Sequence, residues 1–304
     1  MITQEQLQQI EKWLFANARP LEIAKWNLIF HKGTKSDLID EMLKFQNIDG
    51  GFGNGFEPDI HAPDSASVPS SEAILLAQDY ALDLEADWAK KLLDWYENTA
   101  KDTPAIWEGV PESLDEYPHA PWWGYTPNSL DSKFKPYPNA VVASALLSGT
   151  SSQRLLGEKI AERCVKFIFE DESFDWYDTH SLERLFNALL DLESPLITPE
   201  VITSMNSRVL RSVCVNQDEW SGFVAQPLDS IESPSSYWYN LLEKEVQINL
   251  DYWENILTTD GYWPLNFSWG IDTEAAQFAT RSWLGYTVVK RIKTLKAFDR
   301  IEKS

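Results

Sequence analysis

The densest group of ionisable side chains follows a glycine-rich segment in the first quarter of the chain. Glu57, Asp59, His61 and Asp64 lie within eight consecutive positions. Crowded carboxylates push one another's pKa apart, so one can act as a general acid and another as a general base. Oxygen ligands of this kind also suit a divalent cation such as Mg²⁺. A solvated acidic loop, in which Asp59 and Asp64 cap turns or helix starts, would show the same pattern.

A second candidate for proton transfer is His180, which follows Trp176 and Tyr177 at the expected start of a helix. Histidine changes its protonation state near neutral pH and often moves protons in catalysis. A lone histidine at a helix start also serves purely structural purposes. The predicted catalytic residues are therefore Glu57, Asp59, His61, Asp64 and His180.

Aromatic residues are unusually abundant, with 14 Trp, 11 Tyr and 14 Phe. A surplus of rings is typical of an aromatic-lined pocket, although rings also fill large helical cores. Trp122, Trp123 and Tyr125 could stack on a sugar ring or stabilise a carbocation, or simply pack their own loop. The predicted substrate-binding residues are Phe56, Trp122, Trp123, Tyr125, Trp176, Trp263 and Trp269.

The cysteine and histidine content does not predict a zinc centre. Cys164 and Cys214 have no second Cys or His at metal-ligand spacing. Both are expected to be buried thiols in a reducing compartment. The sequence therefore leaves the cofactor open, with Mg²⁺ as the candidate and zinc as the less favoured metal.

Charge and hydropathy limit the classes of partner. The formal net charge is −21, which repels nucleic-acid phosphates and anionic membrane surfaces. No run of ~18 apolar residues predicts a membrane-spanning helix, and the polar N-terminus does not resemble a signal peptide. We expect a cytoplasmic protein with a small-molecule ligand, no nucleic-acid partner and no membrane insertion, and a protein partner stays open.

Apolar spacing along the chain predicts an all-α protein. Apolar residues recur at three- and four-residue steps in many segments, whereas strict strand alternation is nearly absent. The connectors at 49–70, 107–138 and 220–236 exceed ~12–15 residues and are rich in Trp and Tyr, so they resemble functional or self-packed loops rather than linkers. We therefore expect one domain over residues 1–304. The helices are expected around residues 7–14, 75–84, 141–146, 182–192, 201–215, 237–257 and 283–298.

The connectors share a pattern of a glycine–aromatic turn followed by a Pro- or Ser-rich helix start. Asp49-Gly50-Gly51-Phe52-Gly53 precedes Pro69-Ser70-Ser71, and similar strings recur around Trp123, Trp220 and Gly261. Glycine permits a tight turn at positive φ, and Ser or Pro satisfies or removes free N–H groups at a helix start. Spacings of roughly 40–70 residues favour a repeat architecture.

The string Gln46-Asn47-Ile48-Asp49-Gly50-Gly51-Phe52-Gly53 resembles the repeat motif of protein prenyltransferase β subunits and squalene-type cyclases. Asp260-Gly261-Tyr262-Trp263 resembles a degenerate copy, and the segment from Trp283 to Leu295 resembles the last inner helix of that superfamily. Gly55 to Asp59, with Pro69-Ser70-Ser71, resembles a bacterial branch of these toroids. The resemblance implies an α/α toroid, a ring of antiparallel helix pairs with long aromatic-rich loops.

The catalytic motifs of that superfamily are absent from this chain. There is no Asp-x-Asp-Asp string of the class II cyclases, and neither cysteine has the context of the prenyltransferase zinc site. Fold resemblance alone does not transfer an activity. Three functions stay open: an enzyme for an isoprenoid-like or other hydrophobic ligand, a carbohydrate hydrolase or lyase, and a non-catalytic binding scaffold.

Overall fold

The computed structural model describes residues 1–303, and in these residues the chain is helical without an extended strand. Only isolated bridges join extended residues, between Ile2 and Ile301, Gln46 and Phe52, and Ile60 and His119. The expectation of an all-α protein is confirmed. The α-helices are α1 (Gln4–Asn17), α2 (Pro20–Ile29), α3 (Lys35–Met42), α4 (Ser67–Tyr80), α5 (Asp87–Thr99), α6 (Pro136–Leu146), α7 (Ser151–Glu170), α8 (Trp176–Asp191), α9 (Pro199–Ser212), α10 (Pro227–Ser230), α11 (Glu243–Asn255) and α12 (Glu274–Ala297).

Local sequence explains where many of these helices begin. Thr3 and Thr150 each form a capping box, with Gln6 and Gln153, at the starts of α1 and α7. Proline occupies the first turn of α2, α6 and α10, where its missing N–H costs nothing. The helix expected from residue 237 begins at Glu243 instead, because residues Tyr239–Leu241 form a short 3₁₀ turn before it.

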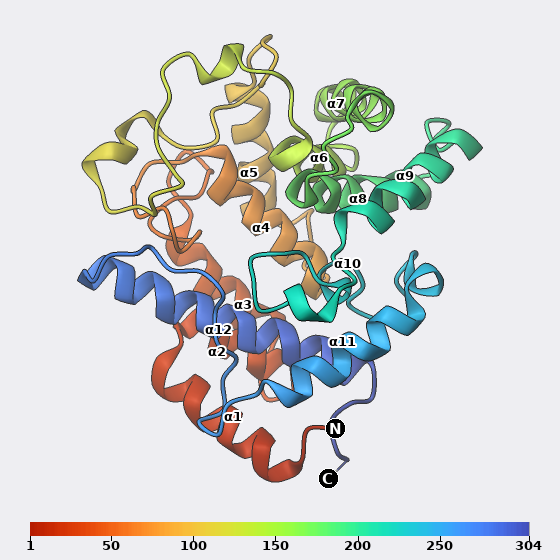
Figure 1. Ribbon diagram of the computed structural model, residues 1–304. Coiled ribbons are helices and arrows are strands. Elements are labelled where there is room, and N and C mark those ends of the chain that lie inside the picture. The colour runs from red at the N-terminus through yellow and green to blue at the C-terminus, as the bar shows by residue number, and fades with distance from the viewer. Residues whose placement is uncertain (304) are drawn as a thin grey trace. The chain divides into compact units, whose positions relative to one another are not determined.

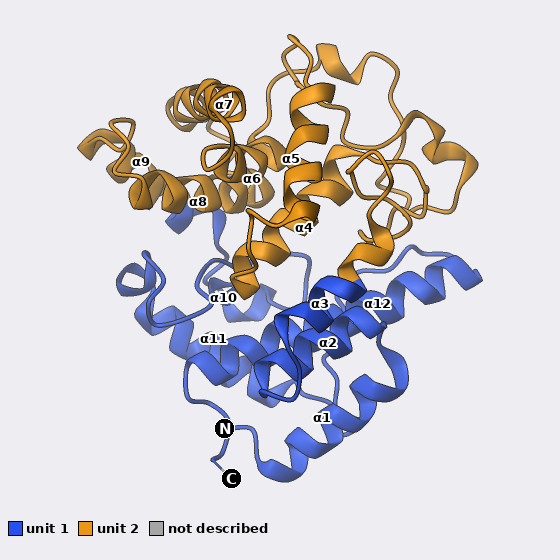
Figure 2. Cartoon of the chain, turned by 180° about the vertical axis from the view of Figure 1, so that it is seen from behind, with its two compact units in different colours: residues 1–41, 209–304 blue, residues 42–208 orange. Residues whose placement is uncertain are grey.

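The chain divides into two compact units (Figure 2). Unit 1 comprises residues 1–41 and 209–304, and unit 2 comprises residues 42–208. The expectation of a single domain over residues 1–304 stays a prediction. No helix within residues 1–303 is both long enough and apolar enough to span a membrane.

Unit 1 joins the two ends of the chain. The backbone N–H of Ile2 donates to the carbonyl of Arg300 at 2.9 Å, and the N–H of Glu302 returns a bond of 2.9 Å to the carbonyl of Ile2, which places the termini side by side (Figure 1). Helices α1, α2 and α12 pack on one another, and α10 packs on α11. Lys290 of α12 binds Asp229 of α10 at 2.9 Å. The unit is therefore tied together by segments from both ends of the sequence.

Unit 2 contains three helices, α4, α6 and α8, that run in the same direction. Near their starts, Val68 and Tyr137 share one apolar cluster, and the rings of Tyr137 and Tyr177 lie 5.7 Å apart. Further along, the Gln78 amide of α4 donates a hydrogen bond to Ser144 Oγ of α6 at 2.8 Å. The Arg184 guanidinium of α8 donates to Asp79 Oδ1 of α4, also at 2.8 Å. Helix α7 packs on α5 and α6 (Figure 1). The N-terminal ends of α4, α6 and α8 consequently converge at one end of the unit.

The two glycine turns bring chain segments into close contact with helix backbones. A Cβ on Gly50, at φ +100°, would lie 2.3 Å from the carbonyl oxygen of Lys91 in α5. A Cβ on Gly261, at φ +91°, would lie 2.6 Å from the carbonyl oxygen of Gln9 in α1. Both positions require glycine, because any side chain would strain the backbone and strike a neighbouring helix. The turns thus have the same packing role, one in each unit.

Candidate functional site

The segment that carries the predicted carboxylates is paired with a distant connector. Ile60 and His119 form an antiparallel bridge, and the N–H of Ala120 donates to the carbonyl of Asp59 at 2.9 Å. The side chains of Glu57 and Asp59 are buried, with 5% and 3% of the residue surface exposed. Glu57 Oε2 accepts the backbone N–H of Asp59 at 2.7 Å. These two carboxylates therefore belong to an ordered, enclosed segment rather than a solvated loop.

The other two ionisable residues of this segment are bound within connectors. His61 Nε2 lies 3.0 Å from the carbonyl oxygen of Pro58, and the His61 N–H donates to the carbonyl of Pro118 at 3.1 Å. Asp64 is exposed and accepts a hydrogen bond from Ser113 Oγ. The structure therefore places His61 and Asp64 in contacts that join one connector to the next.

A row of rings lies at the start of α6 and α8. The Tyr137 ring lies 5.7 Å from Tyr177, the Tyr177 ring 4.9 Å from Trp176, and the Trp176 ring 5.6 Å from the imidazole of His180. We call these four residues the aromatic row. Two of its members, Trp176 and His180, were predicted from the sequence.

Electrostatics place the row beside the carboxylates of the 57–59 segment. Burial first, and then the negative charges of Asp175, Glu57 and Asp59, raise the pKa of Tyr177 to about 12. The pKa of Tyr137 is also raised well above its usual value, first by burial and then by the charges of Glu72 and Glu57. Both phenols therefore keep their protons at neutral pH and can act as hydrogen-bond donors.

The two helix starts are fastened together by aspartates. Asp175 caps α8 by accepting the N–H of Asp178 at 3.1 Å. Asp178 in turn accepts the backbone N–H of Tyr137 at 3.0 Å and lies 3.2 Å from Lys135 Nζ. Burial raises the pKa of Asp178 above its usual value, against the lowering effect of these contacts. These contacts fix the position of Tyr137 relative to Tyr177.

A buried glutamate lies next to the imidazole at the end of the row. Glu183 Oε2 is 3.4 Å from His180 Nδ1, and only 5% of the Glu183 side chain is exposed against 20% for His180. His180 Nδ1 and Glu183 Oε1 are both buried without a hydrogen-bond partner among the described residues. His180 and Glu183 are three residues apart on α8, so they share one face of the helix.

The remaining predicted ligand-binding residues are dispersed. Phe56 packs in the interior against Phe45 and Phe52, with ring centroids 5.3 and 5.1 Å away. Trp122 is 50% exposed, and Trp123 packs on the apolar cluster that also contacts Tyr137. The Tyr125 hydroxyl donates to Glu108 at 3.4 Å.

Two further predicted residues lie in unit 1. Trp263 is fully buried, and its Nε1 donates to the carbonyl of Trp253 at 2.7 Å. Trp269 is also buried, with 6% of its surface exposed. Of the predicted set, the structure therefore brings together Glu57, Asp59, Trp176 and His180.

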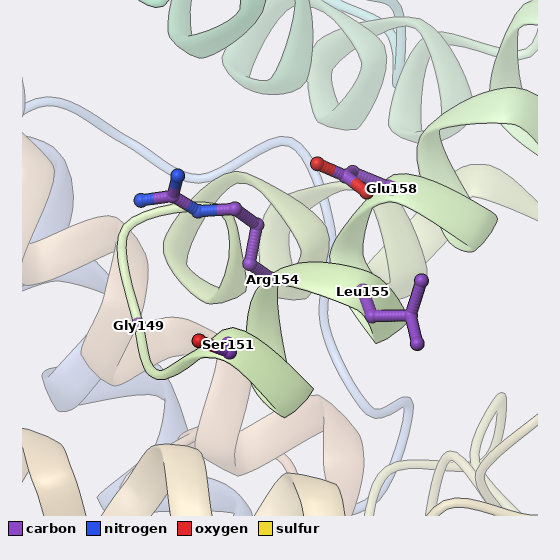
Figure 3. Close-up of a pocket in the computed structure, with 5 residues that line it drawn as sticks. All are labelled: Gly149, Ser151, Arg154, Leu155 and Glu158. Atoms are coloured by element: carbon purple, nitrogen blue, oxygen red, sulfur yellow. The ribbon is translucent and has the colours of Figure 1, made fainter.

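Two other features of unit 2 bear on the choice of site. A pocket at the start of α7 is lined by Gly149, Ser151, Arg154, Leu155 and Glu158, which all come from one short stretch (Figure 3). Its residues do not include the predicted groups. Within residues 1–303, no three or more His, Cys, Asp or Glu side chains are arranged to hold a metal ion, so the arrangement offers acid–base groups without a pre-formed metal centre.

Comparisons with known protein families, with curated proteins and with solved structures find no match for this chain.

Sequence reasoning missed three members of this site: Tyr137, Tyr177 and Glu183. Tyr177 directly follows Trp176, and Glu183 lies three positions after His180, so helical spacing alone could have identified both. Tyr137 lies in the Pro136-Tyr137-Pro138 string and has no sequence neighbour in the site. We call the set Glu57, Asp59, Tyr137, Trp176, Tyr177, His180 and Glu183 the helix-end site.

Proposed function

We propose that this chain is an enzyme of the α/α toroid type, similar to terpenoid cyclases and prenyltransferases, that binds a hydrophobic small molecule at the helix-end site. Several features support the proposal. In unit 2 the parallel helices α4, α6 and α8 alternate along the chain with α5 and α7, and glycine turns in both units press against helix backbones. The ring-shaped arrangement of the helix pairs is part of this proposal.

One observation supports the helix-end site as the ligand site. The 57–59 segment and the start of α8, more than a hundred residues apart in sequence, meet closely enough for the charges of Glu57 and Asp59 to act on the Tyr177 phenol. Aromatic rings beside buried ionisable groups are typical of ligand sites. The rings would contact an apolar or flat part of the ligand, and the ionisable groups would act on its polar end.

The chemistry that fits these groups is acid–base catalysis. A carboxylate or imidazole can accept a proton from the ligand, and a protonated phenol can donate a hydrogen bond to a developing negative oxygen. Glu57 and Asp59 are the proposed carboxylates, and His180 is the proposed imidazole. Mg²⁺ stays a candidate cofactor only if the ligand itself supplies part of the coordination, as a diphosphate would.

A carbohydrate-active enzyme is the second candidate, and the two phenols favour it. Tyr137 and Tyr177 keep their protons at neutral pH, so they could donate hydrogen bonds to sugar hydroxyls while Trp176 stacks on a sugar ring. A non-catalytic scaffold, which keeps the binding surface without the reaction, is the third. We further propose a cytoplasmic protein that binds neither nucleic acid nor the bilayer interior.

Thermal unfolding in the presence of ligands tests the proposal. The purified chain is screened with isoprenoid diphosphates plus Mg²⁺, with neutral terpenes and with oligosaccharides. A ligand at ~100 times its Kd adds ~2.7 kcal/mol of stability and raises Tm. A shift confined to isoprenoids or terpenes supports the first function, and a shift confined to sugars overturns it in favour of the second.

Matched variants locate the binding site. Trp176→Ala should abolish the ligand-induced rise in Tm, whereas Trp122→Ala removes the same kind of side chain from an exposed position and should retain it. Glu57→Gln should retain binding and lose turnover. A rise retained in Trp176→Ala, or no rise with any ligand class, contradicts the helix-end site as the ligand site.

A further inference from the structure

The contact between His180 and Glu183 differs from an ordinary ion pair on a helix surface. Pairs three residues apart are usually exposed and contribute little. Here 95% of the glutamate side chain is enclosed, and its Oε1 has no hydrogen-bond partner among the described residues. Burying a carboxylate without a donor costs free energy, so a buried glutamate is kept where a donor or a proton can reach it.

The imidazole of His180 lies beside this carboxylate. His180 Nδ1 is itself buried without a hydrogen-bond partner and lies 3.4 Å from Glu183 Oε2. Catalytic hydrogen bonds are often long in the absence of ligand and tighten when it binds. A proton on Nδ1 would give that nitrogen an acceptor in Glu183 Oε2, whereas a proton on Nε2 would leave two acceptors, Nδ1 and the carboxylate, facing each other.

The need for a donor on Nδ1 determines which tautomer the His180 imidazole adopts. In a neutral imidazole one nitrogen carries the proton and the other is an acceptor. If the carboxylate holds the proton on Nδ1, the lone pair is on Nε2, where it can accept a proton from a ligand. The imidazole is 20% exposed and stacks 5.6 Å from Trp176, so a ligand lying along the aromatic row can reach it.

We propose that Glu183 is a positioning residue that holds His180 in the Nδ1–H tautomer, and that His180 Nε2 is the group that accepts a proton from the ligand. This inference rests on the proposed function, because it takes the helix-end site as the ligand site. In the reaction step, the bond between the ligand's acidic hydrogen and its heavy atom breaks, its electron pair stays on the ligand, and the proton forms a bond to Nε2. The imidazolium that results is paired with the Glu183 carboxylate.

Long-range ¹H–¹⁵N NMR of the imidazole nitrogens in the full chain tests the pair without any substrate. The chain has four histidines, and the His180 signals are assigned by their loss in His180→Gln. The wild type should show His180 as the Nδ1–H tautomer in its neutral form. Glu183→Leu should convert it to mainly Nε2–H, and Glu183→Gln should retain part of the Nδ1–H form, because the amide oxygen still accepts.

The outcomes separate this inference from the proposed function. Nε2–H in the wild type, or Nδ1–H retained in a folded Glu183→Leu variant, overturns the pair even if a ligand raises Tm. Nδ1–H in the wild type supports the pair even if no ligand class raises Tm, in which case the proposed function fails by itself. Because the wild-type spectrum alone can overturn the inference, a Glu183→Leu variant that fails to fold does not remove the test. Once a substrate is known, Glu183→Gln should lower kcat more than it changes KM.

Discussion

Asp178 Oδ1 in the first turn of α8 accepts the backbone N–H of Tyr137 at 3.0 Å, so a side chain of one helix caps the start of its neighbour. The residue at the start of α6, Lys135, makes no side-chain capping bond of its own. The cap therefore comes from a position 41 residues later in the sequence. This contact fixes the relative position of Tyr137 and Tyr177.

Removing this cap should destabilise the fold. Asp178→Ala leaves the Tyr137 N–H without its acceptor, and the loss of a hydrogen bond to a charged group costs about 1.5–3 kcal/mol. Asp178→Asn keeps an acceptor oxygen in the same place and should lose much less. Urea unfolding of the three proteins measures the difference. Equal stability of Asp178→Ala and wild type would contradict the assigned cap.

The contribution of Asp178 to the unfolding free energy should depend on pH with a definite sign. Because burial raises the pKa of Asp178 in the folded protein, the folded state binds this proton more tightly than the unfolded chain. The contribution is fully present below the unfolded pKa of ~3.9 and is lost as pH rises through the folded value. The unfolding free energy of wild type relative to Asp178→Asn should therefore fall as pH rises from ~3.5 to neutrality. A rise over that interval would show that Lys135 and the Tyr137 N–H lower the pKa of Asp178 by more than burial raises it.

Three glycines form a matched series for the turn. Gly50→Ala meets both a positive φ of 100° and a backbone oxygen at 2.3 Å, so it should cost about 2 kcal/mol or more. Gly270→Ala meets a positive φ of 72° in open space and should cost about 1 kcal/mol. Gly124→Ala meets neither and should be neutral within ~0.5 kcal/mol. Chemical unfolding of the three variants gives the order, and a neutral Gly50→Ala would contradict the assigned packing of the turn on α5.

The Tyr177 phenol should lose its proton only at high pH. Its pKa is about 12, first because of burial and then because of the charges of Asp175, Glu57 and Asp59. The absorbance change of tyrosinate that is missing in Tyr177→Phe should therefore have its midpoint near this value. The stability that the protonated phenol contributes is complete below the unfolded pKa of ~10 and is lost as pH rises toward the folded value.

The same titration tests the position of the carboxylate. Glu57→Gln should lower the Tyr177 midpoint, because one negative charge is removed. Glu158→Gln, in the pocket at the start of α7, serves as the control and should leave it unchanged. An unchanged midpoint in Glu57→Gln would place that carboxylate out of reach of the helix-end site.

The two cysteines should differ in reactivity. Burial raises the pKa of the Cys164 thiol, and a buried protonated thiol is a poor nucleophile. Cys214 is partly exposed, so the expectation that both thiols are buried is wrong for this residue. In the native protein a thiol reagent should modify Cys214 and leave Cys164 intact until urea unfolds the chain, as mass spectrometry of the peptides would show. Modification of both thiols at one rate in the native state would contradict the burial of Cys164.

The periodicity of apolar residues was enough to predict a helical protein, and Asp49-Gly50-Gly51 was enough to predict a tight turn. Both are local properties, since the period of a helix and the φ of a glycine depend on neighbours a few residues away. The start of α11 was predicted too early because a 3₁₀ turn over Tyr239–Leu241 precedes it, and the three-residue period of such a turn is close to that of an α-helix.

The site shows the same division between local and distant information. The sequence by itself singled out Glu57, Asp59, Trp176 and His180 as chemically capable, because residue type and crowding are local facts. It did not reveal that the structure brings these four together, that it binds Asp64 and His61 within connectors, and that it buries Trp263 in unit 1. The tertiary structure alone decided which of these groups meet, because the parallel course of α4, α6 and α8 depends on packing and capping contacts between residues far apart in the chain.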